Sequence, residues 1–260
     1  MRARASTLSL TLLYMKKFGL IGYPLSHSFS KPYFEEKFQK LGLNDHSFET
    51  FSMQDIREFP ALIKREKDLV GLSVTIPHKE TVIPYLDELD ETAREIGAVN
   101  CVRIHNGKLK GFNTDAFGFR QSLRPFLDTN HTKALVFGTG GASKAIAYVL
   151  KNLGIPFWFV SRKKHGEDTL IYADLNAEII SSCKLLVNCT PVGMWPNEKD
   201  ALPIPYEGIT PEHLCYDLIY NPADTVFLKK AKEKGALVSN GHNMLIFQAE
   251  EAWRIWNENH

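Results

Sequence analysis

The 260-residue chain lacks several features that would assign it to a specialised class of protein. It has only four cysteines, with no Cys-x-x-Cys pair and no zinc-like histidine spacing, so we expect a reducing compartment and no metal. Its formal net charge of +1 gives no support for nucleic-acid or membrane binding. It also has no internal repeat and no apolar run long enough to span a bilayer. We therefore expect a globular protein without a nucleic-acid or membrane partner, and the sequence leaves open whether it is a monomer or a homodimer.

Residues 1–14 form a segment of different character. They include Arg2 and Arg4, no acidic residue and a short Leu/Thr/Ser stretch, as a signal or transit peptide does. No small-x-small cleavage site follows, however, and Met15 leads directly into an apolar strand. We expect a disordered or non-native extension, a functional start at Met15 and a cytoplasmic location.

The clearest structural signal is a short apolar run that enters a glycine cluster and leaves as a helix. Residues 134–137 have strand character, Gly138, Gly140 and Gly141 follow, and the next apolar residues recur at helical spacing. Glycines in such a turn let backbone N–H groups approach a phosphate at the helix N-terminus. The pattern predicts a dinucleotide site. Because the third fingerprint position is Ser143 rather than glycine, a plain strand-to-helix turn of another α/β protein is the alternative. The predicted apolar helix face is Ala142, Ala145, Ile146, Val149, Leu150 and Leu153.

The next predicted strand, residues 156–160, indicates which dinucleotide is bound. An Asp or Glu at its end would hold the ribose 2′-hydroxyl of NAD, but this chain has Ser161, Arg162 and two lysines. A guanidinium is a planar, bidentate partner for a 2′-phosphate. NADP is therefore favoured, while a solvated basic loop remains the alternative.

The N-terminal part reads as a first α/β unit with a pair of serines near its start. A strand over residues 18–22 is followed by a turn and then by Ser28 and Ser30. In an extended segment both hydroxyls would point the same way and could bind a small carboxylate. Capping of a helix that starts near Pro32 is the alternative role.

Residues 71–80 predict a strand with one apolar and one hydroxyl-bearing face. Leu72, Val74 and Ile76 alternate with Ser73 and Thr75. Lys79 follows just past the carboxyl end of this strand, where open α/β sheets bind their ligands. Lys79 is either catalytic or a surface lysine.

Two further polar clusters follow. Asn100 lies within an apolar, strand-like run over residues 96–102, and Asp115 ends a turn over residues 111–115. A buried amide or carboxylate needs partners, because each unmet polar group costs about 1 to 3 kcal/mol. These residues either satisfy backbone groups at a domain junction or bind a hydroxylated ligand.

Taken together and in order, these motifs resemble the shikimate dehydrogenase family from about Lys17 to the C-terminus. The resemblance depends on several short segments, each of which matches a family pattern. They are His27–Ser30, Gly71–Lys79, Gly97–Asn100, Gly111–Asp115, Gly138–Ala142, Asn188–Met194 and Tyr216–Pro222.

The resemblance implies an NADP-dependent oxidoreductase that reduces 3-dehydroshikimate to shikimate in aromatic amino acid biosynthesis. It implies catalysis by Lys79 with Asp115. It implies that Ser28 and Ser30 bind the substrate carboxylate, that Thr75, Asn100, Asp115 and Gln248 bind its hydroxyls, and that Tyr220 lies nearby. It places the cofactor at Gly138, Gly140, Gly141, Ala142, Ser161, Arg162, Thr190, Gly241 and Met244.

The sequence departs from the family pattern in places. Ser73 replaces the usual Asn, which removes an amide contact near the substrate; Lys31 stands where Pro is usual, and Ala116 where Gly is usual. Only Arg162 of the basic stretch matches the common pattern. None of these changes affects Lys79 or Asp115.

The last predicted helix, residues 244–256, carries one apolar stripe with Gln248 at its margin. We expect it to return to the first domain. The predicted fold is thus α/β with two domains: a substrate domain of residues 15–115 plus 241–260, and a Rossmann-type NADP domain of residues 116–240. The predicted stripe consists of Leu245, Ala249, Ala252, Trp253 and Trp256.

Three other functions fit parts of this pattern. An NAD-dependent quinate/shikimate dehydrogenase is the nearest, and Arg162 argues against it. A dinucleotide-sensing regulator without turnover shares the fold, but the chain keeps both Lys79 and Asp115. A folate-linked dehydrogenase of similar layout would not be expected to carry the paired serines.

Overall fold

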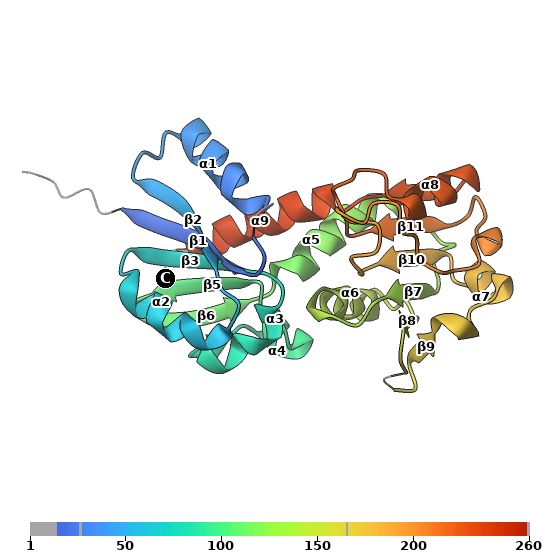
Figure 1. Ribbon diagram of the computed structural model, residues 1–260, viewed down its shortest axis with the longest axis horizontal. Helices are drawn as coiled ribbons and strands as arrows, with labels where there is room; N and C mark the ends of the chain where they lie inside the picture. The colour runs from blue at the N-terminus through green and yellow to red at the C-terminus, as the bar shows by residue number, and fades with distance from the viewer. Residues whose placement is uncertain (1–14, 26–27, 165, 259–260) are drawn as a thin grey trace, which may run out of the picture.

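The computed structural model describes residues 15–25, 28–164 and 166–258, and it contains two six-stranded sheets joined by two long helices (Figure 1). The prediction for residues 1–14 and the motif residue His27 lie outside this range. The predicted two-domain α/β architecture is confirmed.

The N-terminal sheet has the strand order β2-β1-β3-β5-β6-β4. It is mixed, because β1 pairs in parallel with β2 and β3, whereas β5 is antiparallel to both of its neighbours. Its elements are β1 (Lys16–Gly22), α1 (Ser30–Leu41), β2 (His46–Ser52), α2 (Phe59–Arg65), β3 (Leu69–Val74), α3 (His78–Thr81), β4 (Glu88–Leu89), α4 (Glu91–Ile96), β5 (Cys101–His105) and β6 (Lys108–Phe112).

The C-terminal sheet has the order β12-β11-β10-β7-β8-β9, and every pair in it is parallel. All strand carboxyl ends therefore meet at one edge, as in doubly wound nucleotide-binding folds. Its elements are β7 (Ala134–Phe137), α6 (Gly141–Asn152), β8 (Phe157–Ser161), β9 (Thr169–Ile171), α7 (Ala177–Ser182), β10 (Leu185–Asn188), β11 (Leu214–Asp217), α8 (Val226–Glu233) and β12 (Leu237–Ser239).

Helices α5 (Thr114–Leu123) and α9 (His242–Trp256) lie side by side between the sheets (Figure 1). A Cβ at Gly118 would lie 2.6 Å from the carbonyl oxygen of Met244, so only glycine permits this close crossing. Trp256, at the far end of α9, donates to the carbonyl of Val102 in β5 at 3.1 Å. The C-terminal helix thus returns to the N-terminal sheet. The domain boundary that we predict at residue 115 falls within the first turn of α5.

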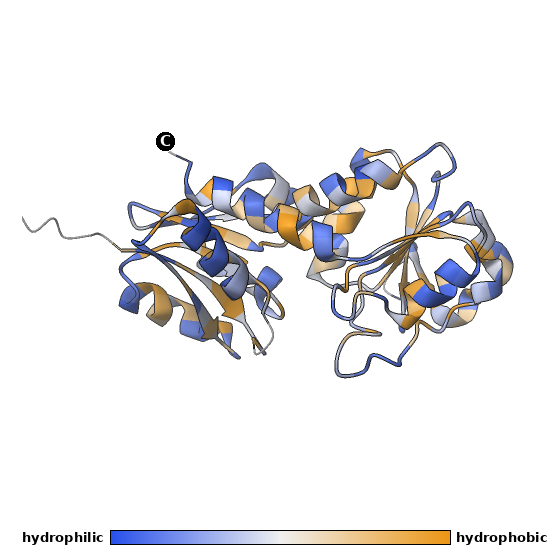
Figure 2. Ribbon diagram, turned by 90° about the horizontal axis from the view of Figure 1, so that it is seen from above, coloured by the Kyte–Doolittle hydropathy of each residue, from blue (hydrophilic) through white to orange (hydrophobic). Residues whose placement is uncertain are grey.

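Hydrophobic residues occupy the strands of both sheets, while the outer helices carry hydrophilic stretches (Figure 2). Strands β7 and β10 are buried along their whole length, as expected for a parallel sheet covered on both faces. Leu150 in α6 packs against this layer, and Trp256 packs into the core of the other sheet. Hydrophobic clusters thus lie against both sheets, and the cluster that contains Leu150 also includes Ile96 and Ala98 of the N-terminal part.

The predicted burial of several side chains was wrong. Ile76, predicted on the apolar face of the strand, is 70% exposed because β3 ends at Val74. Ser73, predicted on the hydroxyl-bearing face, is buried. Leu153 is 43% exposed because α6 ends one residue earlier. In the last helix Leu245 and Trp253 are only half-buried, whereas the other three predicted stripe residues are buried.

Two segments near the site also differ from prediction. Residues 96–102 are not one strand, since Gly97 ends α4 in the left-handed region and β5 starts at Cys101. The predicted turn over residues 111–115 is instead the passage from β6 into α5, where the Asn113 side chain accepts from the backbone of Ala116 at 3.1 Å.

Candidate functional site

An ion pair between Lys79 and Asp115 forms the centre of the site. Lys79 Nζ lies 2.7 Å from Asp115 Oδ2, and the two side chains are only 15% and 8% exposed. Asp115 lies in the first turn of α5, where the helix dipole favours a negative charge. The pair joins two elements 36 residues apart, and it holds the ammonium group at a definite position.

A hydrogen-bond network extends from this pair to α9. Asn100 Nδ2 donates to Asp115 Oδ1 at 2.9 Å and to Gln248 Oε1 at 3.4 Å. Thr114, to which no sequence pattern points, donates from its backbone N–H to Asn100 Oδ1 at 2.6 Å. Gln248 Nε2 donates to the carbonyl of Leu245 at 2.9 Å. Four of the predicted residues are thus brought together, and each is held in a fixed orientation by its neighbours.

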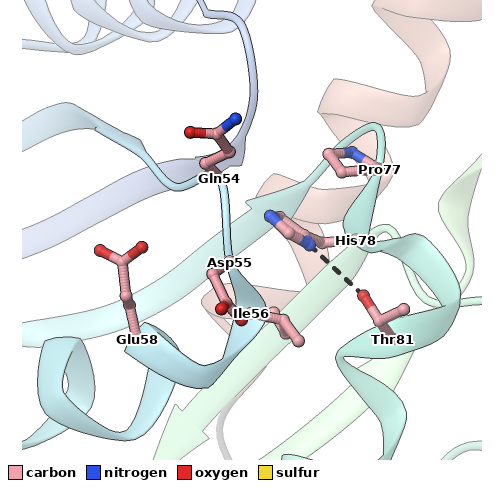
Figure 3. A pocket seen from close by; sticks show the side chains of 7 residues that line it. All are labelled: Gln54, Asp55, Ile56, Glu58, Pro77, His78 and Thr81. Atoms are coloured by element: carbon pink, nitrogen blue, oxygen red, sulfur yellow. Dashed lines mark hydrogen bonds between the residues drawn. The ribbon is translucent and has the colours of Figure 1, made fainter.

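The short helix that carries Lys79 is held in place from its other side. His78 is buried, and its Nε2 lies 2.7 Å from the carbonyl of Met53 while its Nδ1 lies 3.3 Å from Thr81 Oγ1 (Figure 3). The Lys79 carbonyl accepts from the Val99 backbone N–H at 2.7 Å. His78 lines an open pocket that includes none of the residues proposed for the site. Its lining residues are Gln54, Asp55, Ile56, Glu58, Pro77, His78 and Thr81.

The paired serines are arranged differently from our prediction. The segment is not extended, because Phe29 has helical dihedrals and α1 starts at Ser30 rather than near Pro32. Ser28 Oγ accepts from the Ser30 backbone N–H at 3.3 Å, so it already has a role at the helix start. Ser30 is buried and Ser28 is half-buried.

Phe29 lies between the two serines in sequence, and its ring contacts two aromatic residues from the C-terminal part of the chain. Its ring centroid lies 6.0 Å from that of Tyr220 and 6.3 Å from that of His242. Burial raises the pKa of Tyr220 above its usual range.

Thr75 is half-buried directly after β3, with its backbone N–H bonded to the carbonyl of Ile21 at 2.9 Å.

The glycine turn lies where β7 passes into α6, as predicted. Gly138 has φ +103°, a conformation that L side chains rarely adopt, and a Cβ there would lie 3.1 Å from Thr190 Cγ2. A Cβ at Gly140 would meet nothing within 4 Å, so there is open space beside the turn. Ser143 Oγ donates to the Gly140 carbonyl at 2.6 Å, and the serine side chain thereby closes the turn. The turn can accommodate a phosphate.

A buried carboxylate, that of Asp217, holds the segments that follow β10 and β11, next to the glycine turn. Asp217, at the end of β11, accepts from Asn188 Nδ2 at 3.0 Å and from the backbone of Ile219 at 3.0 Å. Asn188 in turn accepts from the backbone and the hydroxyl of Thr190. Burial raises the pKa of Asp217 to about 6, although its hydrogen bonds oppose that shift.

The remaining predicted cofactor residues lie around the same edge. Arg162 is exposed just past the end of β8, next to half-buried Ser161, and Ala142 is half-buried in the first turn of α6. Gly241 donates to the carbonyl of Ile219 at 3.0 Å. Met244 is buried in α9, which starts at His242, two residues before the predicted start of this helix.

Other ligand types find less support among the residues that the structure describes. No group of three His, Cys, Asp or Glu side chains in residues 15–25, 28–164 and 166–258 could hold a metal ion. None of the helices in that same part of the chain is long and apolar enough to cross a membrane.

A parallel sheet with a glycine turn, next to a second domain with a buried lysine–carboxylate pair, defines the class of two-domain dinucleotide-dependent dehydrogenases. A family model for the shikimate dehydrogenase substrate binding domain matches residues 20–102. The shikimate dehydrogenase (NADP(+)) of Halothermothrix orenii is 37% identical over 258 residues, which cover 92% of this chain and 89% of the relative. The chain belongs to the shikimate dehydrogenase family.

Solved structures agree with this membership. Shikimate 5-dehydrogenase from Thermus thermophilus, in complex with NADP(H) and shikimate, matches with a TM-score of 0.83 and 33% identity over 94% of both chains. Quinate dehydrogenase from Corynebacterium glutamicum, in complex with NAD, matches with a TM-score of 0.82 and 26% identity, also over 94% of both chains. The fold therefore does not distinguish these two activities.

Proposed function

We propose that this protein catalyses the reversible reduction of 3-dehydroshikimate to shikimate with NADPH, a step in aromatic amino acid biosynthesis. The observation that carries the proposal is the Lys79–Asp115 pair, with its 2.7 Å contact. The relative from Halothermothrix orenii, named for this activity with NADP, supports it.

The residues at the C-terminal sheet fit NADP. Open space beside Gly140 leaves room for the pyrophosphate at the start of α6, and the exposed Arg162 guanidinium suits the 2′-phosphate. When bound, the nicotinamide supplies or accepts the hydride. The proposed cofactor residues are Gly138, Gly140, Ala142, Ser161, Arg162, Thr190, Gly241 and Met244; Gly141, which the resemblance includes with them, lies against Lys79 instead.

Lys79 exchanges a proton with the reacting substrate oxygen. Its ammonium group has three N–H donors, and the bond to Asp115 uses one of them. Asp115 accepts from Asn100 through its other oxygen, so the carboxylate is held at both ends and keeps the lysine oriented. A remaining N–H of Lys79 donates the proton to the keto oxygen, and the amine takes it back in the reverse direction.

The other polar groups orient the substrate. Asn100 and Gln248 lie within one network with Asp115 and bind ring hydroxyls together with Thr75. Ser28 and Ser30 bind the carboxylate, and Tyr220 closes this side through its ring contact with Phe29. Binding the substrate at several points sets its reacting carbon against the cofactor.

The proposal includes a cytoplasmic enzyme that acts as a monomer or homodimer. All four cysteines are free, and Cys101, Cys183 and Cys215 are buried. Unpaired buried thiols suit a reducing compartment.

The test is the absorbance change of the nicotinamide with four pairings: shikimate or quinate, each with NADP or NAD. We expect rapid turnover with shikimate and NADP only. Comparable rates with quinate or with NAD would assign the chain to the broader quinate/shikimate group. Binding of NADPH without turnover in any pairing would favour a sensor instead.

A further inference from the structure

The two domains touch where the Lys79 helix meets the first turn of α6. A Cβ at Gly141 would lie 3.3 Å from Lys79 Cβ and 3.6 Å from Lys79 Cδ. Because Lys79 Cβ is attached directly to the backbone, a methyl group at Gly141 would displace the lysine by a few tenths of an ångström. Gly141 thus allows α6 to pack directly against Lys79.

An ion pair spans the same contact. Lys144 Nζ, one turn along α6, lies 2.6 Å from Glu80 Oε2, the residue after Lys79. The two side chains are 39% and 45% exposed, so the attraction is screened, but the contact joins residues 64 positions apart. The ion pair thus favours one position of α6 relative to α3, the short helix that carries Lys79.

This arrangement assigns the turn glycines different tasks. Gly138 is required by its positive φ, and Gly140 faces open space where a phosphate can approach. Gly141 has neither feature, since a Cβ there would meet Lys79 and the Glu80 carboxylate, at 3.8 Å, instead of open space. The fingerprint interpretation, in which the glycines serve only the turn and the phosphate, does not account for Gly141.

We propose that Gly141, together with the Lys144–Glu80 ion pair, positions the Lys79 side chain against the first turn of α6. Gly141, Lys144 and Glu80 are positioning residues that act through Lys79, and the inference rests on the proposed function. Misplacement of a catalytic group by a fraction of an ångström lowers the rate of the chemical step more than it lowers binding.

Gly141→Ala is the main test. We expect the single-turnover rate of shikimate oxidation to fall about 10-fold, while the dissociation constants of NADP⁺ and shikimate change by less than about twofold. The unfolding midpoint should change little, because Gly141 is the first residue of α6 and the lysine has to move by only a few tenths of an ångström. A general structural defect would lower both the midpoint and the binding, so the split between rate and binding separates the two explanations.

Gly140→Ala is the matched comparison. Its methyl group would enter the open space beside the turn, so we expect weaker NADP⁺ binding, by about 10-fold or more, as its main effect. If Gly141→Ala instead weakens NADP⁺ binding and leaves the single-turnover rate unchanged, Gly141 serves the phosphate and our proposal is wrong.

The ion pair is tested by Glu80→Gln, Lys144→Gln and the double variant. Each single change should lower the single-turnover rate about 2- to 5-fold, and the double variant should lose no more than either one, because all three lack the same contact. Weaker NADP⁺ binding in Lys144→Gln alone would show that Lys144 serves the phosphate, which overturns its positioning role. Wild-type protein is assayed first: its failure to turn over shikimate with NADP⁺ would refute the proposed function, whereas unchanged variants beside an active wild type would refute only this inference.

Discussion

The two sheets build their halves of the site by different means. At the C-terminal sheet the site consists largely of backbone, in a turn of consecutive residues around Gly138 and Gly140. At the N-terminal sheet it consists of side chains from separate elements, with Lys79, Asp115 and Gln248 far apart in sequence. A site made of backbone is visible in one motif, whereas a site made of side chains exists only once the chain has folded.

This comparison predicts that single side-chain substitutions damage the N-terminal half most. Lys79→Ala should lower kcat by at least about 10², because it removes the proton donor, while shikimate still binds to the remaining groups. Steady-state kinetics and calorimetric titration with shikimate measure the two effects. Lys108→Ala, which removes an exposed lysine from β6 of the same sheet, should leave kcat unchanged. Near-normal turnover of Lys79→Ala would contradict the assignment.

The C-terminal half should depend on a single side chain for its choice of cofactor. Arg162→Ala should raise KM for NADP about 30-fold, since it removes a charge-assisted, bidentate contact with the 2′-phosphate, and should change KM for NAD by less than about twofold. Initial rates with each cofactor test this. Lys151→Ala, at the other end of α6, serves as the control. An equal loss with both cofactors would show that Arg162 does not recognise the 2′-phosphate.

A smaller effect is expected at Asp217, where a buried charge holds the loops of the C-terminal sheet. Its pKa is raised to about 6, so the folded protein binds this proton more tightly than the unfolded chain does. The contribution of Asp217 to stability therefore falls as the pH rises from about 4 to about 6, and is level above that.

Asp217→Asn removes this dependence. Relative to wild type, its free energy of unfolding should increase by about 2 kcal/mol between about pH 4.5 and about pH 7.5, as measured by urea denaturation. Asp224→Asn, at an exposed site eight residues before its partner Lys232, should show no comparable gain. A difference between Asp217→Asn and wild type that does not change with pH would mean that Asp217 is not held at a raised pKa.

Particular residues show how far sequence patterns could predict this structure. The strand of residues 134–137 and the buried positions Ile146 and Leu150 were predicted correctly, because local periodicity reports burial within a regular element. Ile76 and Leu153 were predicted incorrectly, because each lies just beyond the end of its element, where periodicity no longer decides exposure.

The site shows a similar division. Lys79 and Asp115 were both selected from sequence, and the structure joins them. From sequence alone Asn100 has two possible roles, at a domain junction or at a hydroxylated ligand. Its bonds to Thr114 and Gln248 fix its orientation, and the ligand role is the one that we propose. Sequence patterns do not point to Thr114, Glu80 or Lys144, although Thr114 and Glu80 adjoin selected residues and Lys144 lies in the helix that follows the glycine motif.

The amino-acid sequence alone determined the α/β class, the glycine turn and the basic residues that favour NADP, because each of these depends on neighbours within a few positions. Only the tertiary structure decided which polar side chains meet. The Lys79–Asp115 pair and the contact between Gly141 and Lys79 depend on how α5 and α9 place one sheet against the other. Such contacts depend on the packing of elements that are distant in sequence, which a local pattern cannot encode.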